Sequence, residues 1–316
     1  LTTFNNFHYT TNSADLHICF YGNIFRNNFA YQGGAINTMF AYEAKLVSVN
    51  MKTIHIKKSI TVSIEGTKFI LNKAKPVAGA LNLYQISFCF IRRLSFTSNK
   101  GPGAGAIYMK HFSFCSIHRS SFTSNKARKF AAGIHAILGG TLNIHRVTFI
   151  NNNIPACKRL GMGGGIRILA TYNVTVADSL FIGNTARYGV AICIIRGSIV
   201  SIYRVILKKN LAWNPRRRLG GGGIMLERFS RCSVVNSSFV MNNGRYYGGG
   251  LYAEIGEILI LIRTKFTNNS ASVSGGAVRV YDVSNCSIAS SYFMENKAVS
   301  GGAIYVIYAH IVSVYG

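Results

Sequence analysis

A short phrase recurs ten times along this chain: a large apolar residue, two variable residues and an asparagine, followed some residues later by a Gly-Gly-Ala-like triplet. It reads FRNN from Phe25, FTSN from Phe96 and FMEN from Phe293. The recurring asparagines are Asn28, Asn72, Asn99, Asn125, Asn152, Asn184, Asn210, Asn242, Asn269 and Asn296. The steps between them are 26 or 27 residues, except for one of 44 and two of 32. A repeat of this length indicates a solenoid with one coil per repeat.

Between the phrases, apolar and polar residues alternate with a period of two in short runs such as 106–110, 114–118 and 232–236. These runs are rich in β-branched and aromatic residues and are bounded by Gly or Asn, which is typical of strands. We therefore predict an all-β fold, a single-stranded parallel β-helix of about ten coils with a period of about 26–27 residues. Coils stacked at the strand spacing of about 4.8 Å would form a rod about 48 Å long.

Each repeated residue type has a structural role in this geometry. The Phe of one coil is expected to stack on the Phe of the next, and the Asn to occupy a tight bend and hydrogen-bond to its neighbours above and below. The small residues of the triplet let the backbone turn where a side chain would clash. We interpret the asparagine column as scaffold rather than as a catalytic site.

The pairing of Phe-x-x-Asn with Gly-Gly-Ala-Ile, as in FMEN from Phe293 and GGAI from Gly301, resembles the repeat of the chlamydial polymorphic outer-membrane proteins. The likeness extends from about Phe25 to Ile304. It implies a right-handed β-helix of the pectin-lyase-like kind, displayed at a surface and used in adhesion. The chain is far more basic than that family.

The chain is expected to form one domain, 1–316, open at both ends, with a partial first coil at 1–24 and a partial last coil at 305–316. No linker, signal peptide or apolar membrane span is apparent. The last coil stops before its Phe-x-x-Asn, and LTTFNN at the start of the chain resembles the missing half. Open coil ends expose unpaired backbone groups, so we predict head-to-tail stacking of copies into a filament. Trimming from a longer protein is the alternative.

The chain has 35 Lys and Arg against 9 Asp and Glu, a net charge of +26, and should therefore seek anions. The residues six positions before the repeat Asn are mostly basic, and in three coils so is the residue before them. The predicted polyanion-binding column comprises Arg92, Arg93, Arg119, Arg146, Arg204 and Arg263, with His118 and His145 beside it and Asp178 and Asn236 interrupting it.

The two steps of 32 place insertions between the Asn and the Gly triplet. They add further candidate anion-binding residues: Lys158, Arg159, Trp213, Arg216, Arg217 and Arg218. Long loops on a rigid scaffold often bind ligands, and an aromatic ring beside arginines can stack on a base or a sugar. The alternative is a solvated charge run with Trp213 packed against the rod.

Acidic or sulphated polysaccharide is the expected polyanion. Nucleic acid is a less favoured partner, because no nucleic-acid module is present, and acidic partner chains are a third option.

An enzyme is the least favoured reading. Polysaccharide lyases and hydrolases need paired carboxylates or a carboxylate-bound Ca²⁺, and the only promising group is Glu227, Glu254 and Asp282. Glu227 and Glu254 occupy equivalent positions, with Arg228 and Arg279 nearby as ion-pair partners. We expect no enzymatic activity, no cofactor and no metal site.

The seven cysteines lack metal-ligand spacing, and Cys19, Cys89, Cys115, Cys232 and Cys286 are interpreted as core residues. A Cys89–Cys115 disulfide is left open. Candidate glycosylation sequons begin at Asn173, Asn236, Asn268 and Asn285.

Together these features predict a non-enzymatic, extracellular or cell-surface structural protein that stacks end to end and presents a basic flank to polyanions. The alternatives are an adhesin passenger fragment acting as a monomer and a polysaccharide-processing enzyme.

Overall fold

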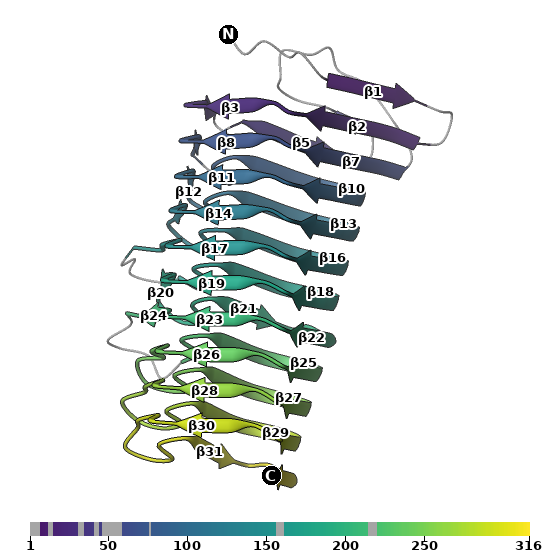
Figure 1. Ribbon diagram of the computed structural model, residues 1–316. Helices are drawn as coiled ribbons and strands as arrows, with labels where there is room; N and C mark the ends of the chain where they lie inside the picture. The colour runs from purple at the N-terminus through teal and green to yellow at the C-terminus, as the bar shows by residue number, and fades with distance from the viewer. Residues whose placement is uncertain are drawn as a thin grey trace.

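The computed structural model describes residues 7–11, 15–30, 35–40, 44–45, 59–75, 77–155, 161–213 and 220–316. These residues form strands, bends and turns, with no helix among them. The strands of successive coils stack in parallel into an elongated solenoid, with the first and last described strands at opposite ends (Figure 1). The predicted all-β parallel solenoid is confirmed.

The largest sheet runs the length of the rod. Its strands are β1 (Phe7–Thr11), β2 (Asp15–Tyr21), β5 (Ile36–Phe40), β6 (Ala44–Lys45), β7 (Ser59–Glu65), β10 (Leu81–Arg92), β13 (Ile107–His118), β16 (Ile134–His145), β18 (Ile166–Ala177), β21 (Ile192–Ile195), β22 (Ile199–Tyr203), β25 (Ile224–Val235), β27 (Leu251–Ile262), β29 (Val278–Ala289), β31 (Ile304–Ile307) and β32 (Ile311–Tyr315). The 12-residue strands bend near their middle, where one residue, such as Arg228 in β25, has a positive φ.

A second, narrow sheet has one short strand per coil. Its strands are β3 (Ile24–Arg26), β8 (Lys68–Ile70), β11 (Ser95–Thr97), β14 (Ser121–Thr123), β17 (Thr148–Ile150), β19 (Leu180–Ile182), β23 (Ile206–Lys208), β26 (Ser238–Val240), β28 (Lys265–Thr267) and β30 (Tyr292–Met294). Two-residue strands form the remaining ladders: β4 (Phe29–Ala30), β9 (Lys73–Ala74), β12 (Lys100–Gly101) and β15 (Lys126–Ala127), and then β20 (Thr185–Ala186) with β24 (Leu211–Ala212).

The register is continuous across the two long repeats. Phe149 pairs with Phe181 and Leu207 with Phe239, although each pair is 32 residues apart. The greater length of these repeats therefore leaves the stacking of the coils unchanged.

Two ladders of side chains run inside the rod. The phenylalanines of the repeat stack face to face, as in Phe122 on Phe149 at 4.7 Å between ring centroids and 9° between planes. From Asn72 to Asn269, each repeat asparagine donates its amide hydrogens to the carboxamide oxygen of the next one and to a backbone carbonyl of the preceding coil, as Asn125 does to Asn152 and to Phe96. These contacts bury the amides and lock one coil onto the next.

The small residues of the triplet permit close approach of the coils. A Cβ atom added at Gly249 would lie 2.2 Å from the carbonyl oxygen of Gly276, much closer than van der Waals contact allows. No side chain fits there without moving backbone.

Outside the central core, a smaller cluster is buried between the main sheet and the Gly-rich turns, and it includes Tyr188, Met225 and Tyr252. Arg279 is also buried there, with its guanidinium 3.6 Å from the centroid of the Tyr247 ring. On the adjacent strands β16 and β18, His135 and Arg167 pair in register and are both buried. A guanidinium nitrogen of Arg167 lies 2.6 Å from Nε2 of His135.

At the N-terminal end, β2 pairs in parallel with β7. The strand β1 pairs antiparallel with the other edge of β2, with Phe7 opposite Phe20, an arrangement that the repeat does not predict. Residues 1–6, the LTTFNN segment expected to complete the last coil, lie outside the described residues.

Candidate anion-binding flank

The arginine column predicted from the repeat lies where the main sheet turns into the narrow sheet. Each member directly follows or ends a long strand, and backbone hydrogen bonds join successive positions, as from Arg93 N to His118 O and from Arg119 N to His145 O. The φ values at this corner lie between 48° and 55° for Arg93, Arg119, Arg146, Arg204 and Arg263, in the left-handed region that non-glycine residues rarely adopt. Every coil requires this conformation at the corner, and the arginine side chains consequently project into solvent.

The side chains before this corner form a second column in strict register. Arg92 pairs with His118, and His118 with His145. The two imidazoles stack, with centroids 5.0 Å apart and planes 5° apart. Desolvation lowers the pKa of His118, and the neighbouring His145 and arginines add to this effect. A bound anion would oppose these electrostatic effects and favour protonation.

Asp178 divides the column. Its carboxylate accepts two hydrogen bonds from Arg204, at 2.5 and 2.8 Å, and lies 2.7 Å from Nε2 of His145. The hydrogen bonds from Arg204 are the main cause that lowers the pKa of Asp178 to about 2. Arg204 is therefore committed to an internal ion pair.

The remaining arginines differ in how freely they can meet an anion. Arg93 lies 3.6 Å from the carboxylate of Glu65. Arg119 and Arg146 are exposed on neighbouring coils, and neither has a carboxylate within ion-pair distance in the described part of the chain. The same holds for Arg263, which lies farther along the rod. Arg119 and Arg146 form the most available cationic surface of the column.

The loop residues predicted to reinforce this flank are only partly placed. Lys158, Arg159, Arg216, Arg217 and Arg218 lie outside the described residues. Trp213 is half-buried, and its indole N–H donates to the carbonyl oxygen of Ile154 at 2.9 Å. This contact holds the ring against the neighbouring insertion, which matches the packing alternative rather than a free stacking platform.

The three candidate catalytic carboxylates do not converge. Glu227 and Glu254 are paired neighbours on β25 and β27, but Asp282 is one position further along its strand, at a bend with φ of 54°. Glu254 accepts a hydrogen bond from the Tyr252 hydroxyl at 2.8 Å. Burial raises the pKa of Tyr252. Arg228 lies 4.0 Å from Glu227, whereas Arg279, the other expected ion-pair partner, packs among tyrosine rings.

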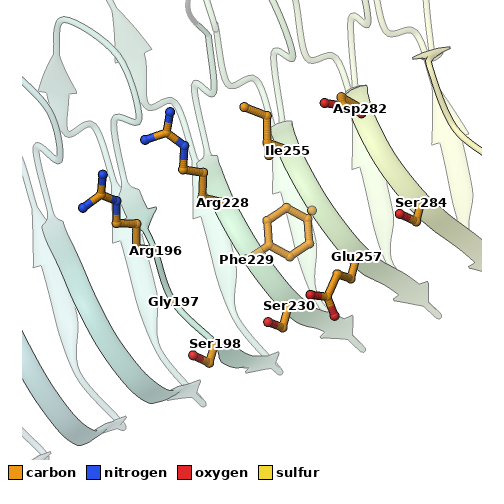
Figure 2. Close-up of a pocket in the computed structure, with 11 residues that line it drawn as sticks. Arg196, Gly197, Ser198, Arg228, Phe229, Ser230, Ile255, Glu257, Asp282 and Ser284 are labelled. Carbon is orange, nitrogen blue, oxygen red and sulfur yellow. The ribbon is translucent and has the colours of Figure 1, made fainter.

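A shallow depression of about 460 Å³ lies on the bends of this region and takes in Asp282. Figure 2 shows Arg196 and Arg228 projecting from neighbouring coils, with Glu257 and Asp282 beyond Phe229. Two cations and two carboxylates balance in formal charge, so the depression offers less attraction for a polyanion than the arginine flank. No group of three His, Cys, Asp or Glu side chains in the described ranges is arranged to hold a metal ion.

The remaining candidates are structural or peripheral. Cys89 and Cys115 are buried, paired in register and unbridged. Of the sequon asparagines, Asn236 and Asn285 are exposed, and Asn173 and Asn268 are half-buried.

A basic group that the sequence analysis did not single out lies at the other edge of the narrow sheet, near the N-terminal end. Lys73, Lys100 and Lys126 align in adjacent strands, and Lys75 and Arg128 lie two residues after Lys73 and Lys126. The signal was present in the sequence, because a lysine follows the repeat asparagine at each of these three coils.

Comparison with known proteins supports the resemblance seen in the repeat. Residues 263–280 and 290–307 match the Chlamydia polymorphic membrane protein repeat, which confirms that the chain carries repeats of this kind. The family is associated with the outer membrane and the cell surface, which supports a surface location for this chain. No curated protein and no solved structure matches the chain. No helix in the described residues is long and apolar enough to span a membrane.

Proposed function

We propose that this chain, which carries the repeat of the Chlamydia polymorphic membrane proteins, is a surface-displayed passenger-type solenoid without catalytic activity that binds an extended polyanion along its arginine flank. The observation that carries the proposal is the pair Arg119 and Arg146, exposed on successive coils with no carboxylate partner in the described residues. A rigid rod presents such side chains at a fixed interval, so a polymer laid along it meets several of them at once.

The positive charges of the flank lie close enough together that a bound anion should stabilise them. Side chains on adjacent coils start about 4.8 Å apart, and like charges at this distance repel by somewhat under about 1 kcal/mol in water. A polyanion would remove this repulsion and gain attraction from the net charge of +26. Acidic polysaccharide is the preferred ligand, because proteins of this family are associated with the cell surface, where glycans are abundant polyanions. Nucleic acid is the alternative ligand.

The experiment measures binding of the purified chain to an immobilised sulphated polysaccharide over a series of salt concentrations. The double variant Arg119→Gln/Arg146→Gln should weaken binding at least about tenfold. It should also flatten the salt dependence of binding, because fewer ion pairs that salt can screen are formed with the polyanion. Arg231→Gln is the control, since Arg231 is exposed on β25 away from the corner. Equal effects of the double and the control variant would refute a specific flank. Tighter binding of single-stranded DNA would favour nucleic acid.

A second proposal concerns end-to-end assembly. β31 and β32 pair with β29 on one side only within the described residues. Apolar side chains are exposed around them, including Ile311 at 56% and Val314 at 62%. This edge can accept a further coil from a second copy, although at the other end of the rod β1 already occupies part of the edge of β2.

Electron microscopy at physiological and high salt tests assembly. Filaments with an axial repeat of about 48 Å would support head-to-tail stacking, whereas single rods under all conditions would leave the adhesin monomer as the working function.

A further inference from the structure

The lysines at the second corner of the rod surround a hollow. A pocket of about 480 Å³ lies across the two-residue strands β4, β9 and β12 and the segments that follow β12 and β15. Its lining residues are Phe29, Lys73, Ala74, Lys75, Lys100, Gly101, Pro102 and Arg128. Four of the eight are cationic, and none is acidic. This volume lies in the range of pockets that hold small ligands.

The repeat explains why the pocket is open between its cations. Position by position, Lys73 aligns with Lys100, and the next residues are the small Ala74 and Gly101. A Cβ atom on Gly101 would lie 2.2 Å from the carbonyl oxygen of Ala104, so this floor position must stay small. The two lysines precede these floor residues in the chain. Lys75 directly follows Ala74, and Arg128 comes from the next coil, where it lies two residues after Lys126.

Phe29 gives the pocket an apolar end. Its side chain is 66% exposed, which is unusual for a phenylalanine in a protein whose repeat phenylalanines are buried. The Lys75 ammonium lies 5.8 Å from its ring centroid, a cation–π arrangement that positions the lysine at the pocket. The ring therefore presents apolar surface beside four positive charges.

We propose that this pocket binds the end or a short segment of an anionic glycan, with sulfate or carboxylate groups on the cations and a sugar ring against Phe29. Lysine ammonium groups act as point charges that suit such groups without bidentate geometry. A single exposed aromatic ring fits one pyranose face, whereas binding of single-stranded nucleic acid uses several stacking side chains along a groove. The pocket is separated from Arg93 and Arg119 by the narrow sheet. It shares the surface location and the class of ligand with the proposed function, but none of the residues of the arginine flank.

The test uses the full chain and a fluorescently labelled sulfated tetrasaccharide, with the unsulfated tetrasaccharide as the neutral reference. Lys100→Gln and Lys126→Gln form a matched pair, because both lysines are exposed members of one column and only Lys100 lines the pocket. The Lys100→Gln variant should bind the sulfated probe about three- to tenfold more weakly, and Lys126→Gln less than about twofold. Phe29→Leu should weaken binding as well, because it removes the flat ring.

Two outcomes overturn the proposal: equal effects of Lys100→Gln and Lys126→Gln, or tighter binding of a six-nucleotide single-stranded DNA than of the sulfated probe. The double variant Arg119→Gln/Arg146→Gln separates the two sites. Its affinity for the tetrasaccharide should stay within about twofold of that of the unsubstituted chain, while its affinity for the long polysaccharide falls. Loss of tetrasaccharide binding in this variant would place the probe on the arginine flank and refute the pocket. Unchanged circular dichroism spectra show that each variant folds.

Discussion

The asparagine ladder predicts a large cost for removing one of its central members. The Asn152 side chain is fully buried and takes part in four hydrogen bonds. Its amide nitrogen donates to Phe122 O at 2.8 Å and to Asn184 Oδ1 at 3.0 Å, and its oxygen accepts from the backbone and side-chain nitrogens of Asn125 at 3.1 and 3.0 Å. In Asn152→Ala, the Asn125 backbone N–H and the Phe122 carbonyl lose these partners inside the core.

Each buried polar group left unsatisfied costs about 1–3 kcal/mol. The Asn125 backbone N–H would be such a group. Together with the other lost hydrogen bonds and the loss of side-chain packing, it predicts a decrease of about 3–5 kcal/mol in the free energy of unfolding. Asn143→Ala is the matched control, since Asn143 lies half-buried on β16 in the preceding part of the same coil. Its replacement should change stability by no more than about 0.5 kcal/mol.

The assay is urea denaturation followed by far-ultraviolet circular dichroism, with amide hydrogen exchange as a local readout. Solenoids lose stability coil by coil when one interface is weakened, so exchange should accelerate most in the coils that contain Asn125, Asn152 and Asn184. A difference below about 1 kcal/mol between Asn152→Ala and Asn143→Ala, with uniform exchange, would show that the ladder does not hold the coils together.

Three further predictions concern other buried positions. Burial, and then the nearby Arg167, lower the pKa of His135 well below 6.5. As the pH falls, the unfolded chain therefore takes up the proton before the folded one does. The free energy of unfolding should fall below about pH 6.5, by up to about 1.4 kcal/mol per pH unit. His135→Asn should flatten this pH dependence in urea titrations at about pH 5 to 7. Phe149→Ala should cost about 3–5 kcal/mol in the same assay, and Phe149→Leu clearly less, because the ring is fully buried in the stack. Gly249→Ala should lower the melting temperature by several degrees, since the added Cβ meets backbone, whereas Gly316→Ala, with no atom within 4 Å of its Cβ, should leave it unchanged.

The repeat made the interior of the rod predictable. Because Phe and Asn recur at nearly fixed steps, their columns follow from counting, and the position six residues before each asparagine identifies the corner at Arg93 and its equivalents. The antiparallel β1 did not follow, because it precedes the first repeat phrase at Phe25 and the repeat sets no register for it. Nor did the indole contact of Trp213, since it joins two insertions, whose conformations no repeat constrains.

Counting was also insufficient for the charges, because their partners lie on other coils. The sequence places Asp178 as a gap in the arginine column, but the structure shows a bridge that occupies both Arg204 and His145. A gap would only shorten the cationic surface. A bridge also removes one of its arginines, and it leaves Arg119 and Arg146 available on one side and, beyond Asn236, Arg263 on the other.

The interior ladders explain why the functional surfaces lie at the corners. The Phe and Asn columns fix the register of every coil, so an outward side chain such as Arg119 lies directly beside its equivalent Arg146, whatever the residues are. Substituting an outward residue therefore alters the surface without altering the fold. The narrow sheet is three residues wide, or about 10 Å, and it separates the arginine corner from the lysine corner near the N-terminal end. If both corners bind anionic sugars, combining Lys100→Gln with Arg119→Gln/Arg146→Gln should weaken binding of a long polysaccharide more than either change alone. If the fold-losses of affinity simply multiply, the two corners act as separate sites.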